Sequence, residues 1–307
     1  DSVRMEALPA VDMEAVSIAG PTLATAGQQA VYDVTVLNFG SGAVSDYTVN
    51  LKDSEGTLLG TATVAEAIAP NATAAIPVTW TPAAAGTYQV YGEMVAAGDA
   101  DATNNQSSTI GVYVIGATDE YMALGDPETT TTTYELPINI FYRSSVTEEL
   151  YFPDEMHLQS GTISDIVYKN NFANNREDVA IKIYMKHTTV EDLSAGWLPI
   201  DATDLVFDGT VDMPAGVNNI VIPLTTPFNY TGGVLATRVF RVRDADGSLS
   251  SSDKFYYTNT PDHANRSRYV RSDDATYDPL APSGAGTMSN YMPNTTFVVQ
   301  NPVWMQS

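Results

Sequence analysis

The chain has 307 residues, of which 37 are acidic and 14 basic, and its net charge of −23 argues against binding nucleic acid or anionic membranes. It contains no cysteine, which excludes disulfides and thiolate chemistry. No apolar run approaches the ~20 residues needed to span a bilayer, so we expect no membrane insertion.

The basic residues are distributed unevenly along the chain. Up to Gly116 there are 12 acidic residues but only Arg4 and Lys52 as basic ones, which leaves 25 acidic and 12 basic residues for the remainder. This shift predicts two domains, residues 1–116 and 117–307. The chain begins abruptly at Asp1-Ser-Val-Arg, so we expect a processed chain or a piece of a larger exported polypeptide, whose other domains would be its partners.

Alternating apolar and polar residues, separated by Gly, Pro and Asn turns, predict strands in the first domain. The segment 21–27 is expected to be a connection. Seven short strands with frequent turns are typical of an immunoglobulin-like sandwich. The predicted strands are residues 11–18, 31–38, 47–51, 58–64, 75–80, 87–91 and 109–114.

Five short sequence pieces follow one another in this domain: Ala26-Gly27, Val36-Leu-Asn-Phe-Gly40, Val78-Thr-Trp-Thr-Pro82, Ala85-Gly-Thr-Tyr88 and the acidic stretch 99–105. In this order and spacing they resemble the CARDB domain, a cell-adhesion-related module of bacterial and archaeal surface proteins. The resemblance covers roughly residues 10–115. It implies an immunoglobulin-like sandwich with a spacer or adhesive role and no enzymatic activity.

The second domain also reads as strands, and only residues 190–194 suggest a helical turn. The five threonines 129–133 would lead into the first strand. This strand count over ~180 residues, without helices, predicts a larger sandwich of the jelly-roll kind. The predicted strands are residues 134–142, 163–169, 179–186, 205–211, 218–224, 234–242, 255–258 and 295–299.

Five further pieces characterise the second domain: residues 136–142, Gly196-Trp197, and residues 206–211, 222–230 and 291–297. Together they resemble a module that recurs in secreted multidomain proteins of the Bacteroidetes type. That resemblance implies a companion of adhesive and immunoglobulin-like modules. It implies no functional residues.

We predict no catalytic residue. The chain has no Gly-x-Ser-x-Gly motif, and its three histidines lack the spacing of a metal site. The adjacent pairs Glu148-Glu149, Asp154-Glu155 and Asp273-Asp274 would point to opposite faces of a strand, so adjacency does not make a catalytic dyad. Two distant carboxylates could still form one, and this alternative stays open.

Calcium is the one inorganic ligand that the sequence suggests, because closely spaced Asp, Asn and Ser oxygens are its usual ligands. The first candidate site is Asp244, Asp246 and Ser248 with Asp253 beyond, although a plain Asp-Gly hairpin turn explains this segment better. The second candidate is Asp99, Asp101 and Asn104, for which a solvated loop is the favoured alternative. No other cofactor is expected.

A mixture of aromatic residues and arginines suggests a glycan-binding patch, since rings stack on sugar faces and arginines bind carboxylates. Packing at a strand edge, with arginine stems along apolar surface, is the favoured alternative. The candidate residues are Trp197, Tyr257, Arg266, Arg268, Tyr269, Arg271 and Tyr277.

Taken together, these patterns predict an all-β chain, an immunoglobulin-like sandwich followed by a jelly-roll-like sandwich. We expect a non-catalytic module pair, extracellular or on the cell surface, that spaces and presents a binding face to a protein or glycan, including one of a host. Two alternatives remain: a carbohydrate-binding accessory region of a secreted hydrolase, and a self-assembling filament or surface-layer subunit, joined through strand edges.

Overall fold

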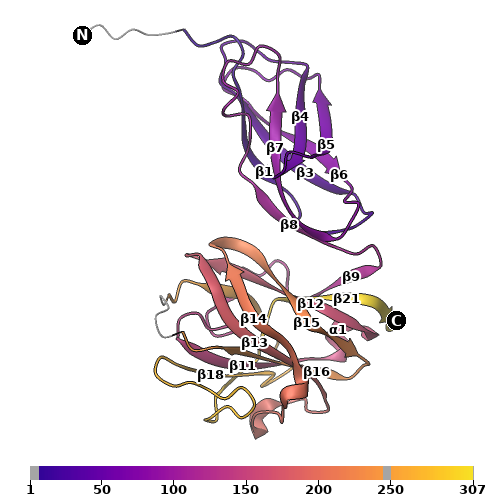
Figure 1. The fold of residues 1–307 in the computed structure, drawn as a ribbon, viewed down its shortest axis with the longest axis vertical. Helices are drawn as coiled ribbons and strands as arrows, with labels where there is room; N and C mark the ends of the chain where they lie inside the picture. The colour runs from indigo at the N-terminus through magenta and orange to yellow at the C-terminus, as the bar shows by residue number, and fades with distance from the viewer. Residues whose placement is uncertain (1–6, 245–249, 307) are drawn as a thin grey trace, which may run out of the picture. The chain divides into compact units, whose positions relative to one another are not determined.

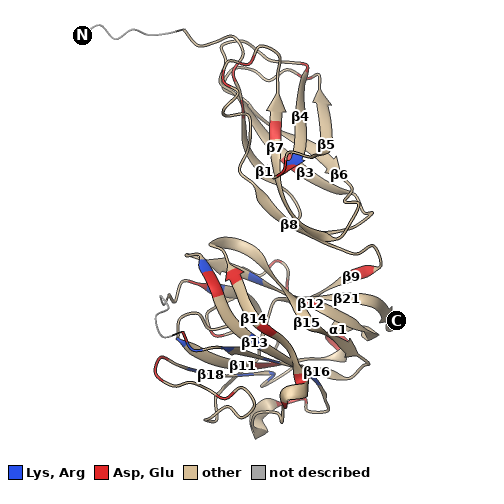
Figure 2. Cartoon of the chain, viewed as in Figure 1, with Lys and Arg blue, Asp and Glu red and all other residues tan. Residues whose placement is uncertain are grey.

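The computed structural model describes residues 7–244 and 250–306, and 56% of the chain is strand against 3% helix. Contacts divide the chain into two compact units between Ala117 and Thr118 (Figure 1). Figure 2 shows that acidic residues occur in both units, whereas the basic residues gather in the second. The prediction of an all-β fold is confirmed.

Within the described part of the first unit, eight strands form two sheets. One sheet has the order β1 (Met13–Ala19), β3 (Ala30–Asn38) and β6 (Thr73–Trp80). The other has the order β2 (Leu23–Thr25), β8 (Ile110–Ile115), β7 (Gly86–Val95), β4 (Tyr47–Asp53) and β5 (Leu58–Val64). All pairs are antiparallel except β2 with β8, which are parallel.

Because apolar and polar residues alternate along these strands, every second side chain lies between the two sheets. Tyr32, Val34 and Val36 of β3 are fully buried, as are Val49 and Leu51 of β4. This is the immunoglobulin-like sandwich that the sequence predicts. The predicted connection 21–27 was wrong in one respect, because it contains β2, whose three residues are too few to show an alternating pattern.

The second unit, over its described residues, has two larger sheets. The first has the order β10 (Thr132–Thr133), β17 (Lys254–Asn259), β12 (Leu158–Phe172), β21 (Thr295–Trp304) and β9 (Asp119–Leu124), with β15 (Gly216–Tyr230) on β12 and β20 (Tyr291–Pro293) on β17. The second has the order β14 (Leu205–Met213), β13 (Arg176–Thr188), β16 (Val234–Arg241), β11 (Ser144–Tyr151), β18 (Ser267–Ser272) and β19 (Thr287–Ser289). Short helical turns lie at α1 (Pro153–Met156), η1 (Leu193–Ala195) and η2 (Ala202–Asp204).

Apolar side chains from both of these sheets meet in one core. Ile166 of β12 and Phe297 of β21 come from the first sheet, and Ile183 of β13 and Val239 of β16 come from the second. The chain crosses between the sheets repeatedly, as in jelly rolls, and every strand pair in this unit is antiparallel. The predicted two-sheet sandwich is therefore confirmed.

One predicted strand of the second unit is wrong. Residues 134–142 form no strand, although apolar residues alternate in their sequence. All of residues 136–140 are buried, so the segment packs on the core without pairing with a neighbouring strand. Conversely, β9, β11 and β18 lie where no strand was predicted, and the helical turn expected at 190–194 is η1, at Leu193–Ala195.

Candidate ligand-binding surface

Six aromatic side chains adjoin one another in the second unit, and we refer to them as the aromatic band. The Tyr257 and Tyr291 ring centroids are 4.2 Å apart, and Phe141 lies 5.4 Å from Tyr134 and 5.1 Å from Tyr142. Tyr269 lies between these groups, because its ring contacts Arg271 as the rings of Tyr134 and Tyr142 do, and Ser267, two residues before it, donates to the Tyr291 carbonyl. All six are partly exposed. The band consists of Tyr134, Phe141, Tyr142, Tyr257, Tyr269 and Tyr291.

Arg271 lies among the rings of the aromatic band. Its guanidinium carbon is 4.8 Å from the Tyr142 ring centroid, 5.4 Å from that of Tyr269 and 5.8 Å from that of Tyr134. Arg271 also pairs with Glu135, which holds the guanidinium in place. These cation–π contacts fix three rings before any ligand arrives.

Three tyrosine hydroxyls of this surface have a raised pKa, those of Tyr257, Tyr269 and Tyr277. Burial raises the pKa of Tyr269, and the neighbouring tyrosines raise it further. Burial also raises the pKa of Tyr257, and its hydrogen bond with Tyr291 adds to the effect. At Tyr277 burial again raises the pKa, and the positive charge of Arg271 opposes the rise. A neutral phenol can both donate and accept a hydrogen bond, which suits a sugar hydroxyl.

Trp197 belongs to a different cluster. Its ring lies 5.5 Å from the guanidinium carbon of Arg238 and 5.7 Å from that of Arg268, and its Nε1 donates to the Gly284 carbonyl at 3.0 Å. Arg268 is buried and donates from Nε to the Leu193 carbonyl at 3.1 Å. This cluster covers the outer face of the sheet.

Arg266 lies in a third place, fully buried beside α1. It donates to both carboxylate oxygens of Glu155, at 2.5 and 2.7 Å, and to the Leu150 carbonyl at 2.6 and 3.2 Å. Phe152 lies 5.2 Å from its guanidinium carbon. Of the seven glycan-binding candidates, the structure therefore brings together Tyr257, Tyr269, Arg271 and Tyr277, but not Trp197, Arg268 or Arg266.

Four members of the aromatic band are not among the predicted glycan-binding residues: Tyr134, Phe141 and Tyr142, and also Tyr291, which the sequence places in a loop as it does Trp197 and Tyr277. The first three lie in the segment that was predicted as a strand, where alternation suggests packing against a core. Their partial exposure depends on the path of this segment past β18, and no local pattern encodes that path. One feature of the sequence could have indicated these rings, namely the density of aromatic residues around Leu136-Pro137.

The first calcium candidate is only partly described. Asp246 and Ser248 lie outside the described residues. Asp244 is half exposed, 3.8 Å from Arg241. Asp253 is buried and accepts from the backbone nitrogens of Ala173 and Asn174, at 2.9 and 3.1 Å, and from Nε of Arg176 at 2.7 Å. Asp253 therefore ties the start of β17 to the turn between β12 and β13.

The second calcium candidate lies in the loop between β7 and β8. Asp99 accepts from the Met13 backbone nitrogen at 2.9 Å and from Nδ2 of Asn105 at 2.6 Å. Asp101 is exposed and accepts from Thr103, whose nitrogen and hydroxyl lie at 2.9 and 2.6 Å. The Asn104 carbonyl accepts from the Ala15 nitrogen at 3.1 Å.

Three side-chain oxygens near this loop have no donor. The Oδ1 atoms of Asp12, Asn104 and Asn105 are buried without a hydrogen-bond partner. Within residues 7–244 and 250–306, no group of three or more His, Cys, Asp or Glu side chains is arranged to hold a metal. A site here would therefore need amide and backbone oxygens beside the carboxylates of Asp12 and Asp99, and calcium stays a prediction.

Within residues 7–244 and 250–306, the structure contains no helix with the length and apolar character of a membrane span.

Comparisons with known proteins match the first unit. A CARDB domain from Pyrococcus furiosus, solved in complex with di-metal ions, is 26% identical, covers 38% of this chain and 97% of its own, and has a TM-score of 0.29. A domain from Methanosarcina acetivorans, described as part of a cell surface protein, is 20% identical over 34% of this chain and 92% of its own, with a TM-score of 0.29. Among curated proteins, none matches the chain.

A comparison with protein families tests the resemblance of the first unit to the CARDB domain. The CARDB family model matches residues 10–109, which confirms the resemblance for the first unit. The Bacteroidetes-type resemblance of the second unit is not shown and stays a prediction. Over residues 10–109 the chain is thus similar to CARDB, a family of non-catalytic immunoglobulin-like domains.

Proposed function

We propose that this chain is a non-catalytic extracellular protein in which the first unit is a spacer and the second unit binds a glycan through the aromatic band. The observation that carries the proposal is a set of six partly exposed rings, of which Tyr134, Tyr142 and Tyr269 contact Arg271 and the others pair with a neighbouring ring. The CARDB match supports the extracellular location, because CARDB domains occur in cell-surface proteins.

The physical basis is stacking of sugar rings on aromatic rings. The apolar C–H face of a sugar packs against an aromatic ring, and neutral tyrosine hydroxyls bond to the sugar hydroxyls. The rings already contact one another and Arg271, so little side-chain entropy is lost on binding. The same surface would serve the alternative of a carbohydrate-binding region attached to a secreted hydrolase.

Replacing Tyr291 by alanine is expected to weaken glycan binding about tenfold, since an aromatic anchor is typically worth ~1–2 kcal/mol. Tyr291 is 36% exposed, so its loss removes ring surface with little effect on the core. A glycan array on the unmodified chain would identify ligands, and titration calorimetry would measure the affinity of each variant.

Tyr256→Ala is the matched control for this experiment. Tyr256 lies next to Tyr257 on β17, but its ring contacts Lys169 at 4.9 Å and belongs to no pair of the band. It should leave the affinity unchanged. The proposal fails if no glycan binds at high micromolar concentration, or if both variants weaken binding equally.

We also propose that the loop between β7 and β8 binds calcium. The supporting observation is that Asp12, Asn104 and Asn105 each keep a buried oxygen without a donor, next to the carboxylate of Asp99. A buried acceptor without a donor is unfavourable, and Ca²⁺ prefers such oxygen ligands.

Millimolar calcium is therefore expected to raise the melting temperature of the first unit, and EDTA to reverse the rise, because a ligand that binds only the folded state stabilises it. Asp12→Asn should weaken the response, whereas Asp33→Asn on β3, an exposed carboxylate, should not. An unchanged melting temperature with EDTA would contradict the calcium proposal.

Assembly of the chain into filaments through strand edges stays a prediction. Light scattering at increasing protein concentration would measure it.

A further inference from the structure

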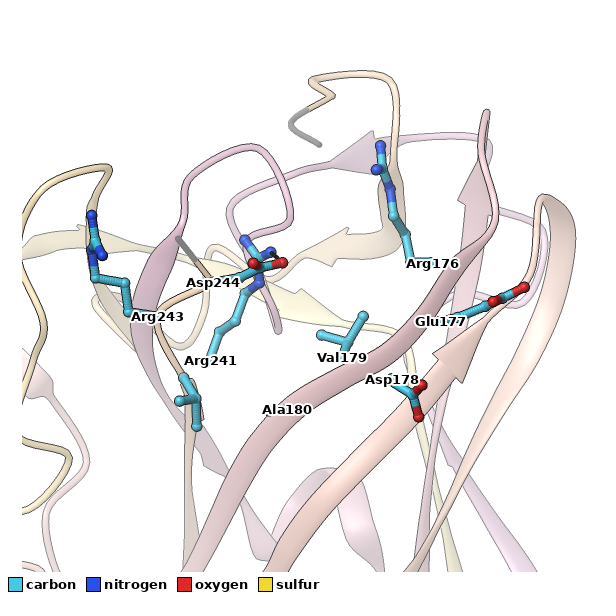
Figure 3. Close-up of a pocket in the computed structure, with 9 residues that line it drawn as sticks. Arg176, Glu177, Asp178, Val179, Ala180, Arg241, Arg243 and Asp244 are labelled. Atoms are coloured by element: carbon cyan, nitrogen blue, oxygen red, sulfur yellow. Dashed lines mark ion pairs between the residues drawn. The ribbon is translucent and has the colours of Figure 1, made fainter. Parts of the chain in front are cut away.

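A hollow of about 350 Å³ opens at one end of β13 and β16 in the second unit (Figure 3). Three arginines line it, Arg176 from the start of β13, Arg241 from the end of β16 and Arg243 just beyond. With Arg143 close by, four of the chain's 14 basic residues gather here, although the net charge is −23. The concentration of arginines around one hollow points to a negatively charged ligand.

Arg241 lines this hollow with a guanidinium edge that faces Asp244. It is only 4% exposed, and its Nη1 donates to the carbonyls of Asn139, Ile140 and Tyr142. Its Nη2 lies 3.8 Å from Asp244, beyond hydrogen-bond distance, and its Nε is buried without a partner. The Nε and Nη2 groups together form the edge of a guanidinium that binds a carboxylate through two parallel hydrogen bonds.

The neighbouring arginines repeat this pattern. Arg243 donates from Nη2 to the Asp273 carbonyl at 3.2 Å, while its Nε is buried without an acceptor, as is Nε of Arg143. A buried N–H that lacks an acceptor is unfavourable, and three in one place are unusual. Burial lowers the pKa of Arg241, Asp244 opposes this and Arg176 adds to it; an anion in the hollow would oppose the lowering further.

Three acidic residues also line the hollow, Glu177, Asp178 and Asp244. Figure 3 shows the carboxylates of Glu177 and Asp178 on the side away from Arg243. Asp178 accepts from the Thr210 hydroxyl at 3.4 Å, on the neighbouring strand β14. Asp244 faces Arg241 but is half exposed, so it can move aside when a ligand arrives.

Tyr142 connects the aromatic band with Arg241, which lines the hollow. The Tyr142 carbonyl accepts from Nη1 of Arg241, and the ring of the same residue lies 4.8 Å from the guanidinium carbon of Arg271. A sugar chain stacked on the band at Tyr142 would therefore have the arginine hollow within reach of its next residues.

We propose that this hollow binds the carboxylate of an acidic sugar, so that the glycan recognised by the second unit contains uronic acid. The inference rests on the proposed glycan-binding function and deepens it by naming the ligand class. A planar carboxylate matches the Nε–Nη2 edge of Arg241, where it would take the place of Asp244, and Arg243 supplies a second cation in the lining of the hollow.

The test compares short oligomers of galacturonate, mannuronate and glucuronate with the same oligomers after reduction of their carboxyl groups. Titration calorimetry at 0.15 M salt limits repulsion from the acidic surface to a range of ~8 Å. The unmodified chain is expected to bind at least one acidic oligomer about tenfold more tightly than its reduced form, as expected for a bidentate charged contact.

Arg243→Gln is the variant of choice, because Arg243 is only partly buried and the substitution spares Arg241. It should reduce the preference for the acidic oligomer, because only Arg241 then faces the carboxylate, and leave the affinity for the reduced one unchanged. Lys52→Gln in the first unit removes the same charge and should keep the preference; melting curves establish that both variants are folded.

The outcomes separate this inference from the proposed function. Equal affinity for acidic and reduced oligomers, or a preference that Arg243→Gln does not diminish, overturns the carboxylate site but leaves glycan binding standing. Tighter binding of a sulfated oligosaccharide than of any uronate also overturns it. If Tyr291→Ala has no effect while Arg243→Gln does, the aromatic band fails and an isolated anion site remains.

Discussion

Replacing Arg238 by methionine is expected to lower the free energy of unfolding of the second unit by about 3–5 kcal/mol. Arg238 and Glu148 are both fully buried, and Oε1 of Glu148 accepts from Nε and Nη2 of Arg238 at 3.1 and 2.6 Å. The substitution leaves a buried carboxylate without its partner. Burial already raises the pKa of Glu148, and Arg238 opposes that rise, so the loss of Arg238 makes the charged form still less favourable.

Arg238 also holds the loops that cover this face of the sheet. Its Nη2 donates to the Leu198 carbonyl at 2.6 Å and its Nη1 to the Pro279 carbonyl at 2.9 Å. Glu148 accepts from the Leu198 nitrogen at 3.1 Å. The ion pair therefore connects two strands with two loops, and its loss removes more than one contact.

Chemical denaturation of the second unit would measure this effect. Lys182→Met is the matched control, because Lys182 forms an exposed ion pair with Asp208 at 2.6 Å, which is worth less than ~1 kcal/mol. The double variant Glu148→Met, Arg238→Met should recover part of the loss, since it leaves no unpaired carboxylate, although Arg268 loses the charge opposite it. Equal losses in Arg238→Met and Lys182→Met would contradict the explanation.

Replacing Glu149 by glutamine is expected to remove most of the pH dependence of stability between about pH 5 and 8. Glu149 is fully buried, and its Oε2 accepts from the Thr237 hydroxyl at 3.2 Å, whereas Oε1 has no partner. Burial raises the pKa of Glu149 to about 8. The folded protein therefore holds a proton on Glu149 at neutral pH.

The sign of the effect follows from the two pKa values. Between an unfolded pKa near 4.5 and a folded pKa of about 8, the folded state keeps a proton that the unfolded state releases. Stability is therefore greatest below this window, falls as the pH rises through it, and levels off above it. At ~1.4 kcal/mol per pH unit, the total is on the order of 5 kcal/mol.

Denaturation at several pH values between 5 and 8 would measure this slope. Glu149→Gln keeps the shape of the side chain without a titrating proton, so its slope should be much smaller. A residual slope of the same sign is expected, because burial also raises the pKa of Glu148. Glu177→Gln, at an exposed position, is the control, and an unchanged slope in Glu149→Gln would refute the assignment.

The strands that the sequence predicts are those buried on one face. In β3 and β4, alternate residues enter the core, so a period of two appears in the sequence. All eight residues of β11 are buried, with Glu148 under the covering loops and Glu149 between the sheets, so no alternation appears. Glu148 and Glu149 therefore point to opposite faces of the sheet, as expected for neighbours on a strand.

The candidate site was predictable to the extent that its residues share a strand. Tyr269 and Arg271 lie two residues apart on β18, and the mixture of aromatic residues and arginines drew attention to them. The burial of Arg268 was not predictable, because it depends on Glu148 lying opposite on β11 and on the carbonyl of Leu193. These partners are distant in sequence, and only the register of the sheet brings them together.

The two ends of the second unit are joined in one sheet. β9 opens this unit, and in the described sheet its hydrogen-bonded neighbour is β21, which closes it, with Thr295 opposite Leu124. During synthesis, the first unit can complete its sandwich once residues 1–117 are available, whereas the second must wait for its last strand. Such pairing over a long stretch of chain folds slowly and leaves edge strands exposed meanwhile. The acidic surface, which makes chains repel one another, would protect the unfinished second unit from aggregation.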